Sequence, residues 1–244
     1  MVLVGKAAVV TGAARRIGAT IAHSLAARGA SVVVHYRSSA GAAEDTVTSI
    51  RDRGGTAIAV GGDLSLAADA ERLFTATLDA FGRADVLVNN ASTFRRTPVD
   101  TLEEADWDDM IDNNLHAARH PALRFGRWMR DQGDGAIVNI ADTAAERPWR
   151  GYLPYSIAKA GIVALTRGLA KELAPAVRVN AIAPGPIVFP DDFDDAARER
   201  EIARTLLRRE GHPQNIADAV LALVENDYIT GVLLPVDGGR SLAA

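Results

Sequence analysis

Cysteine is absent from this chain of 244 residues, which excludes disulfides, a thiolate nucleophile and a cysteine-ligated metal site. Strong charge of either sign is absent too: the formal net charge is −4, and the 27 Lys and Arg residues form no long basic stripe. A nucleic-acid partner is therefore not expected. No apolar run reaches the length of a membrane span. These absences together favour a cytoplasmic protein that does not use a membrane.

The apolar start of the chain, residues 2–10, contains Gly5 and Lys6 and runs directly into a glycine-rich turn. It lacks a basic segment and a small-residue cleavage site, the two marks of a signal peptide. We therefore expect a first β-strand here.

Short β-branched runs alternate with amphipathic stretches along the whole chain. The strands are nearly all apolar, which is typical of a parallel sheet covered on both faces. The pattern predicts an α/β Rossmann-type, doubly wound sheet with helices on both faces, and one domain over residues 1–244, since no linker or repeat interrupts it. Strands are expected at 7–11, 31–35, 56–60, 86–89, 136–140, 178–182 and 231–234, and helices at 17–28, 42–53, 67–81, 106–130, 154–173 and 196–209.

A glycine-rich turn joins the first strand to the first helix, with the sequence Thr-Gly-Ala-Ala-Arg-Arg-Ile-Gly over residues 11–18. At this position backbone N–H groups and the helix dipole bind a pyrophosphate. A glycine pair alone is weak support, but its place at the start of a βαβ unit predicts a dinucleotide site.

The segment after the second strand indicates which dinucleotide binds. An NAD site places Asp or Glu there to bind the ribose hydroxyls. This chain has His35, Tyr36, Arg37 and Ser38 instead, and the next acid is Glu44 in the following helix. Arg37 and Ser38, faced by Arg15 or Arg16 from the first turn, suit a 2′-phosphate, so NADP(H) is the expected cofactor.

Tyr155 and Lys159 are four residues apart on a predicted helix and therefore share one face. A phenol with a pKa of about 10 is a poor proton-transfer group at neutral pH. We expect the Lys159 ammonium to lie beside the phenol and to lower its pKa.

These residues, with Asn114 and the segments Asn89-Asn90-Ala91 and Pro184-Gly185, resemble the short-chain dehydrogenase/reductase family over essentially the whole chain. The resemblance implies a seven-stranded sheet, a proton relay of Asn114, Tyr155 and Lys159, and a homotetramer, which the long helices at 106–130 and 154–173 suit. It implies a cofactor bound by these residues: Gly12, Arg15, Arg16, Ile17, Gly18, His35, Tyr36, Arg37, Ser38, Asp63, Leu64, Asn90, Ala91, Ser92, Tyr155, Lys159, Pro184, Gly185 and Ile187.

Two departures from the general family pattern are similar to the pteridine reductase branch, including the dihydromonapterin reductases. Arg16 stands where the family has Gly, and Asp142 where it has Ser. The segment Asn90-Ala91-Ser92-Thr93-Phe94 also resembles that branch. The resemblance implies a pterin that stacks on Phe94 opposite the nicotinamide, in a substrate site made of Arg16, Ser92, Phe94, Asp142 and Tyr155.

The chemistry of a dihydropterin explains a carboxylate at position 142. A ketone reductase uses the Ser hydroxyl to donate to an oxygen that gains negative charge, and a carboxylate would repel that charge. A dihydropterin offers N–H donors and a C=N nitrogen that must take a proton, which Asp142 can accept or help Tyr155 to supply. Asp142 also follows a strand, so capping of the next turn is the structural alternative.

Three signals carry less weight. His116 and His120 are spaced as two metal ligands, but no third ligand is suggested and no metal is expected. The acidic run over residues 191–195 suits a solvated turn or the capped start of the next helix. It falls where the family's substrate loop closes, which makes Val188 and Phe189 candidate lid residues.

Three functions are consistent with these features. The first is NADPH-dependent reduction of a dihydropterin of the dihydromonapterin or dihydrobiopterin type, with dihydrofolate as a further substrate. The second is a carbonyl reductase of the oxoacyl or sugar type that tolerates Asp142. The third is a dinucleotide-binding sensor without turnover, which would have no need of a proton relay.

Overall fold

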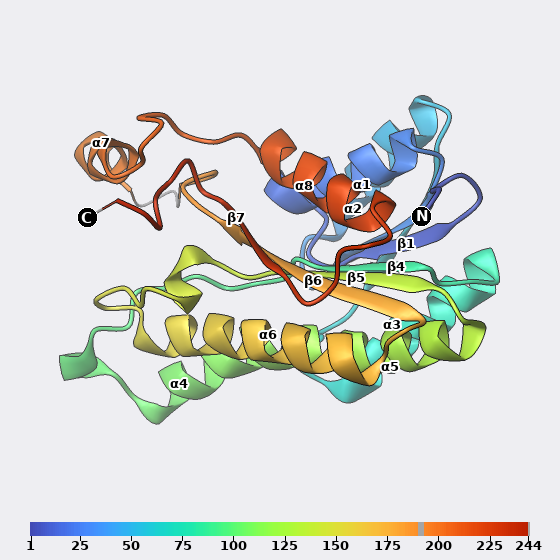
Figure 1. The fold of residues 1–244 in the computed structure, drawn as a ribbon, viewed down its shortest axis with the longest axis horizontal. Helices are drawn as coiled ribbons and strands as arrows, with labels where there is room; N and C mark the ends of the chain where they lie inside the picture. The colour runs from blue at the N-terminus through green and yellow to red at the C-terminus, as the bar shows by residue number, and fades with distance from the viewer. Residues whose placement is uncertain (190–192, 244) are drawn as a thin grey trace.

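A single parallel sheet of seven strands forms the centre of the molecule (Figure 1). The computed structural model describes residues 1–189 and 193–243. The strand order is β3-β2-β1-β4-β5-β6-β7, and each neighbouring pair is parallel. The strands are β1 (Ala7–Val10), β2 (Ser31–Tyr36), β3 (Thr56–Gly61), β4 (Val86–Asn89), β5 (Gly135–Ile140), β6 (Val177–Pro184) and β7 (Leu233–Val236).

Helices cover both faces of the sheet, as the apolar strands predict. One face carries α1 (Arg16–Ala27), α2 (Ala40–Asp52) and α8 (Pro213–Glu225), and the other carries α3 (Ala67–Phe81), α5 (Ala117–Gln132) and α6 (Leu153–Glu172) (Figure 1). Side chains of successive strand residues alternate between the two layers: Val10 packs with the α1, α2 and α8 side, and Val9 with the other. The doubly wound fold is therefore confirmed.

The reversal of strand order beside β1 positions the site. From β1 the chain winds outward to β2 and β3 and then returns to β4 on the other side of β1. Doubly wound sheets bind ligands at the carboxyl ends of strands at such a switch point. Residues 11–18 after β1 and 90–94 after β4 meet there.

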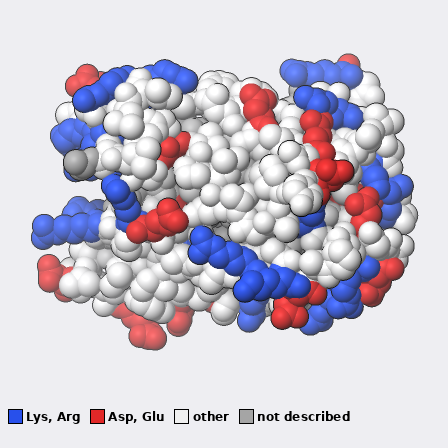
Figure 2. All heavy atoms as spheres, in the orientation of Figure 1, with Lys and Arg blue, Asp and Glu red and all other residues white. Residues whose placement is uncertain are grey.

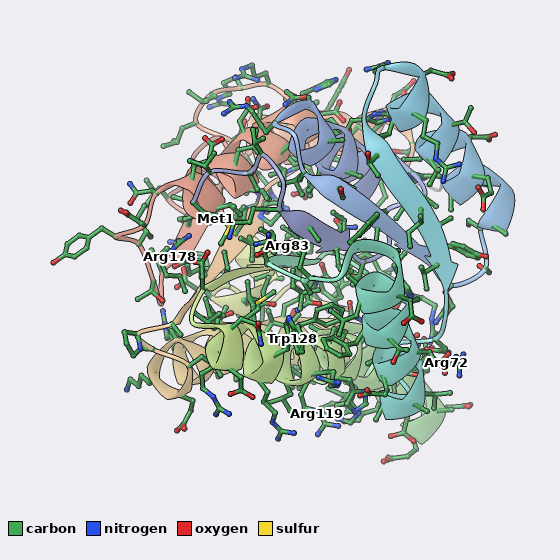
Figure 3. The ribbon with its side chains drawn as sticks, turned by 90° about the vertical axis from the view of Figure 1, so that its right-hand side faces the viewer. Met1, Arg72, Arg83, Arg119, Trp128 and Arg178 are labelled. Atoms are coloured by element: carbon green, nitrogen blue, oxygen red, sulfur yellow. The ribbon has the colours of Figure 1, made fainter. Side chains whose placement is uncertain are left out.

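The opposite edge of the sheet, at the amino ends of the strands, is occupied by structural contacts. Figure 3 looks onto this side, where Met1, Arg83 and Arg178 lie. Arg178 donates to the carbonyls of Leu223 and Val224 at the end of α8, at 2.6 and 2.8 Å. Arg83 pairs with Asp85 at 2.6 Å. These polar groups are paired with one another, and Arg178 joins β6 to the end of α8.

The helical stretch predicted near 106–130 is helical throughout, but it is not one α-helix. It is three consecutive pieces: α4 (Glu104–Met110), a π-helix (Ile111–His116) and α5. The inserted π-turn contains Asn114, and π-turns of this kind are frequent at functional sites.

Two other predicted elements differ from the structure. The last strand begins at Leu233 instead of residue 231, because Gly231 has a φ of +76° that a strand does not use. The helix predicted at 196–209 is α7 (Asp195–Ala203), and Arg208 with a φ of +51° lies outside it. Asp194 caps α7 by accepting from the Ala197 N–H at 2.6 Å, whereas Asp191 and Asp192 lie outside the described residues.

None of the described helices combines the length and apolar content needed to cross a bilayer.

Candidate active site

The turn after β1 requires glycine at two positions. Gly12 has a φ of +61°, and a Cβ there would lie 2.9 Å from the Ala91 Cα. A Cβ on Gly18 would lie 2.4 Å from the Gly12 carbonyl oxygen. Both distances are shorter than real Cβ contacts, so the turn packs backbone against backbone beside the segment after β4. The same packing leaves its N–H groups at the start of α1, where a phosphate binds.

Hydrogen bonds of the Thr11 and Asn90 side chains join this turn to the segment after β4. The Thr11 hydroxyl accepts from the N–H groups of Asn90 and Ala91, both at 2.9 Å. The Asn90 amide donates back to the carbonyls of Thr11 and Gly12, at 2.9 and 3.0 Å. Thr11 was not among the predicted site residues, although a Thr before the first Gly was a signal for it.

A cleft of about 470 Å³ opens over the turn at the carboxyl ends of the strands. It brings together the predicted cofactor residues of the first three strand ends and of the segment after β4: Gly12, Arg15, Arg16, Ile17, Gly18, His35, Tyr36, Arg37, Ser38, Asp63, Leu64, Asn90, Ala91 and Ser92. Phe94 and Val188 line it as well, and so does Asn113, which the sequence did not suggest.

The residues of the cleft fit a dinucleotide phosphate. The glycine cradle excludes side chains, and the first turn of α1 carries no acidic residue. At the far corner Arg37 donates to Asn113 across the cleft, and no carboxylate follows β2 before Glu44. This corner suits a 2′-phosphate better than free ribose hydroxyls.

Pro184, Gly185 and Ile187 lie apart from this cleft. Gly185 donates to the Val236 carbonyl at 3.1 Å, and a Cβ on it would lie 2.6 Å from the Asp237 Cα. Ile187 lines a second cavity of about 410 Å³ beside Leu206 and Leu207. Their predicted contact with the cofactor stays a prediction.

Arg16 adopts a backbone conformation that favours glycine. Its φ is +53°, in the left-handed region that costs a residue with a Cβ about 1–2 kcal/mol. The general family pattern has Gly at this position, and the conformation accounts for that preference. An Arg held there at an energetic cost, with its side chain lining the cleft, indicates a functional role.

Arg16→Gly is expected to stabilise the protein while weakening cofactor binding. Relief of the left-handed strain, partly offset by the backbone entropy of glycine, gives a gain of about 0.5–1 kcal/mol. Loss of a charged phosphate contact raises the NADPH Kd roughly tenfold. Thermal melts and fluorescence titration with NADPH measure the two effects. A variant with lower stability and unchanged affinity would contradict this role.

His35 is a buried residue of the cleft that hydrogen-bonds to two backbone segments, and its predicted contact with the cofactor stays a prediction. Its Nδ1 accepts from the Gly12 N–H at 3.3 Å, and its Nε2 lies 3.1 Å from the Gly62 carbonyl, which requires the neutral ring with the proton on Nε2. The residue is 2% exposed, and burial lowers the pKa of His35 to about 4. His35 therefore holds the glycine turn against the end of β3.

His35→Leu is expected to remove part of the acid sensitivity of the fold. Between pH 6.5 and about 4 the unfolded chain binds a proton on His35 that the folded protein does not, so wild-type stability declines as pH falls through this window. The loss is at most about 3 kcal/mol. Urea unfolding at pH 7.5, 6, 5 and about 4 compares the slopes. Equal slopes for variant and wild type would show that His35 is not this titrating group.

Asp142 serves both as a cap and as a hydrogen-bond partner of Tyr155. It lies two residues beyond β5 at the start of a 3₁₀ turn (Thr143–Ala145), where its Oδ1 accepts from the Ala144 N–H at 2.7 Å. Its Oδ2 accepts from the Tyr155 hydroxyl at 2.8 Å. One oxygen therefore caps the turn, as the structural alternative predicts, and the other contacts Tyr155. The role of Asp142 toward a substrate stays a prediction.

The expected effect of Lys159 on the Tyr155 pKa is wrong in this structure. Burial and the adjacent Asp142 carboxylate raise the pKa of Tyr155 well above its ordinary value. The Lys159 Nζ lies 5.6 Å from the Tyr155 ring centroid and donates to the Ile140 carbonyl at 3.0 Å. Burial lowers the pKa of Lys159 to about 8 and raises that of Asp142. Tyr155 is therefore a protonated donor, as a general acid must be.

Asn114 is fully buried in the π-helix, and its side chain is held in place on every side. Its amide group donates to the Met110 carbonyl at 2.9 Å and to the Thr93 hydroxyl at 3.3 Å. Its oxygen accepts from the Ser92 hydroxyl at 2.5 Å. Asn114 thereby joins Ser92 and Thr93 to the π-helix, and its place in a proton relay stays a prediction.

Phe94 lies next to Tyr155 in an aromatic cluster. The Phe94 ring is 5.0 Å from the Tyr155 ring, edge to face, and stacks on the Tyr152 ring at 4.6 Å. Trp149 contacts Phe94 edge to face at 6.1 Å. Tyr152 covers one face of the Phe94 ring. Phe94 is 36% exposed, so part of its ring remains accessible to a planar substrate. Tyr152 was not among the predicted site residues.

The paired histidines of α5 and the preceding π-helix have other partners. His116 Nδ1 lies 3.0 Å from Asp112 Oδ1, and His120 Nδ1 lies 3.1 Å from the Leu64 carbonyl. Within residues 1–189 and 193–243, no group of three or more His, Cys, Asp or Glu side chains is arranged to hold a metal ion.

Comparison with known proteins shows similarity to reductases and dehydrogenases over nearly the whole chain. Residues 12–241 match a family model described as enoyl-(acyl carrier protein) reductase. The chain is 39% identical over 241 residues to a 3-oxoacyl-[acyl-carrier-protein] reductase of a Synechocystis species, with 97% of each chain covered. It is 37% identical to 3beta-hydroxysteroid dehydrogenase 1 of Eggerthella lenta, covering 98% of this chain and 95% of that one.

Solved structures agree. A crystal structure from Sinorhizobium meliloti, provisionally described as a short-chain alcohol dehydrogenase, superposes with a TM-score of 0.94 and 33% identity over 100% of both chains.

Proposed function

The chain belongs to the short-chain dehydrogenase/reductase family, and from that premise we propose that it reduces the C=N bond of a dihydropterin with NADPH. The observation that carries this proposal is the Asp142 carboxyl group, which contacts the Tyr155 hydroxyl at 2.8 Å. A substrate placed against these two groups therefore meets a hydrogen-bond acceptor beside a proton donor. A dihydropterin, with N–H donors next to an imine nitrogen, has the complementary pattern.

Different residues donate the proton, accept the substrate N–H groups and contact the heterocycle. NADPH, held over the glycine turn, would supply the hydride for the imine carbon. Tyr155 gives its proton to the imine nitrogen, so that C=N becomes CH–NH. Asp142 accepts the substrate N–H groups through Oδ2, and the Ala144 N–H keeps the carboxyl group in place through Oδ1. Phe94 offers its accessible ring surface to the heterocycle, and Tyr152 supports it from behind.

Lys159 acts after the proton has left Tyr155. Its ammonium, held by the Ile140 carbonyl, is the cation available to stabilise the phenolate. Arg37, Ser38 and Arg16 would hold the cofactor phosphates over the glycine turn. A homotetramer is part of this proposal, and Leu153 and Ile157, 38% and 41% exposed on α6, offer apolar contacts for it.

A second candidate is reduction of a ketone, of the 3-oxoacyl type. The named relatives favour it, since one acts on 3-oxoacyl groups and another on a hydroxysteroid. The site disfavours it, because hydride addition to a ketone builds negative charge on an oxygen that would face Asp142.

One panel separates the two candidates. NADPH oxidation is measured with 7,8-dihydropterins, dihydrofolate, 3-oxoacyl thioesters and simple ketones, and NADH replaces NADPH in a parallel series. The proposal expects turnover of the dihydropterins with NADPH preferred. Turnover of 3-oxoacyl thioesters alone would establish the second candidate, and binding of NADPH without any turnover would favour a sensor.

A further inference from the structure

Two loops join to form one wall beside the reacting groups. The Thr97 N–H donates to the Gly151 carbonyl at 2.7 Å, and Thr97 and Tyr152 form a parallel bridge. The stacked rings of Phe94 and Tyr152 connect the same two loops one step closer to Tyr155. The loop after β4 and the loop after β5 are therefore a single structural unit at the substrate side of the cleft.

Two arginines lie on this wall, one from each loop. The Tyr152 N–H donates to the Trp149 carbonyl at 3.1 Å, which closes a turn with Arg150 and Gly151 at its centre. Gly151 has a φ of +80°, as the third residue of a type II turn requires, so Arg150 is at the tip. The Arg96 side chain crosses Gly151: a Cβ there would lie 3.2 Å from the Arg96 Nε.

These two guanidinium groups lack the acidic partners that their neighbour has. Arg95 pairs with Asp106 at 2.6 Å and with Asp109 at 3.3 Å. Arg96 and Arg150 are exposed, and in the described part of the chain neither makes an ion pair. Basic side chains protrude at the left-hand end of the molecule in Figure 2, the end where α4 and α7 lie in Figure 1. Two uncompensated cations on this one wall raise the local concentration of anions there.

We propose that Arg96 and Arg150 form an anion-binding rim, and that the substrate carries a carboxylate or phosphate at the end remote from its reacting carbon. The proposal rests on the proposed placement of the substrate between Phe94, Asp142 and Tyr155. It does not depend on whether the reacting bond is C=N or C=O, because the rim meets only the far end of the molecule.

Matched substrate pairs test the rim. In the first pair, dihydrofolate, which carries a glutamate tail, is compared with a dihydropterin that lacks one. In the second pair, a 3-oxoacyl coenzyme A thioester, which carries phosphates, is compared with the uncharged N-acetylcysteamine thioester. In the Arg96→Ala/Arg150→Ala double variant, kcat/KM for the anionic member should fall roughly tenfold through KM. The uncharged member should be unaffected, and whichever pair responds identifies carboxylate or phosphate.

Arg95→Ala is the matched control, because its charge is already neutralised by Asp106 and Asp109. The anion preference of wild type should also shrink as salt rises to about 0.5 M. Equal loss for both members of a pair, no loss in the double variant, or the same loss in Arg95→Ala would overturn the rim.

Binding gives a readout that does not need turnover. Quenching of the intrinsic tryptophan fluorescence by folate and by pterin, in the NADP⁺ complex, measures the same preference. If the catalytic panel fails but folate binds more tightly than pterin through Arg96 and Arg150, the rim stands and the proposed reaction does not. If both ligands bind equally to wild type and to the double variant, the rim fails independently of the reaction.

Discussion

Tyr155→Phe is expected to lower kcat by roughly 10²–10⁴-fold, because it removes the hydroxyl that donates to Asp142 Oδ2 at 2.8 Å. Phenylalanine keeps the ring that packs edge to face on Phe94 at 5.0 Å, so the pocket should keep its shape. Single-turnover oxidation of bound NADPH measures the chemical step directly.

The control for Tyr155→Phe is cofactor affinity. The NADPH Kd should change by less than about threefold, since the Tyr155 side chain does not line the cofactor cleft. A variant that reduces its substrate at more than about a tenth of the wild-type rate would assign the proton to another group. Asp142 would then be the first to test, because burial raises its pKa.

Lys159→Met is expected to inactivate the enzyme and to stabilise its fold. Lys159 is 2% exposed, and burial lowers its pKa from 10.5 to about 8, so its charge at pH 7 costs up to about 3 kcal/mol of folding free energy. Loss of the hydrogen bond to the Ile140 carbonyl offsets part of this gain. We expect a net gain of about 1–2 kcal/mol in urea unfolding, with loss of at least about 10²-fold in kcat/KM.

The pH dependence identifies Lys159 as the cause. Between pH 8 and 10.5 the unfolded chain still holds the Lys159 proton while the folded protein has released it, so wild-type stability gains from this residue as pH rises. The stability advantage of Lys159→Met should therefore shrink across this window. Wild-type kcat/KM should fall above pH 8 as the ammonium is lost. A constant difference in stability between the two proteins would show that the buried charge is not the cause.

The fold was predictable because its pattern is local and repeated. Successive apolar residues such as Val9 and Val10 pack into opposite layers. Nearly all-apolar strands therefore indicate a sheet that is covered on both faces. The need for glycine at positions 12 and 18 was predictable, because the backbone of the turn lies so close to other backbone that a side chain does not fit. Element ends were less predictable, since they depend on single conformations such as the φ of +76° at Gly231.

Many residues that line the cleft were predictable from the sequence, but the electrostatics around Tyr155 were not. The spacing of Tyr155 and Lys159 shows that they share a helix face, but not that the Lys159 Nζ donates to Ile140 while Asp142 takes the Tyr155 hydroxyl. His35 likewise looked like a cofactor ligand, and only tertiary packing reveals its contacts with Gly12 and Gly62. Contacts between residues far apart in sequence leave no local pattern from which to infer them.

The most direct test of the central claim, that Asp142 selects the substrate, is kcat/KM of wild type and Asp142→Ser for one dihydropterin and one 3-oxoacyl thioester. Serine can cap the Ala144 N–H as Asp142 does, so stability should be little changed and the comparison isolates the lost carboxyl oxygen. We predict that wild type prefers the dihydropterin and that the variant loses at least roughly tenfold on it while gaining on the thioester. Wild-type preference for the thioester, or dihydropterin reduction unaltered in Asp142→Ser, would contradict this account.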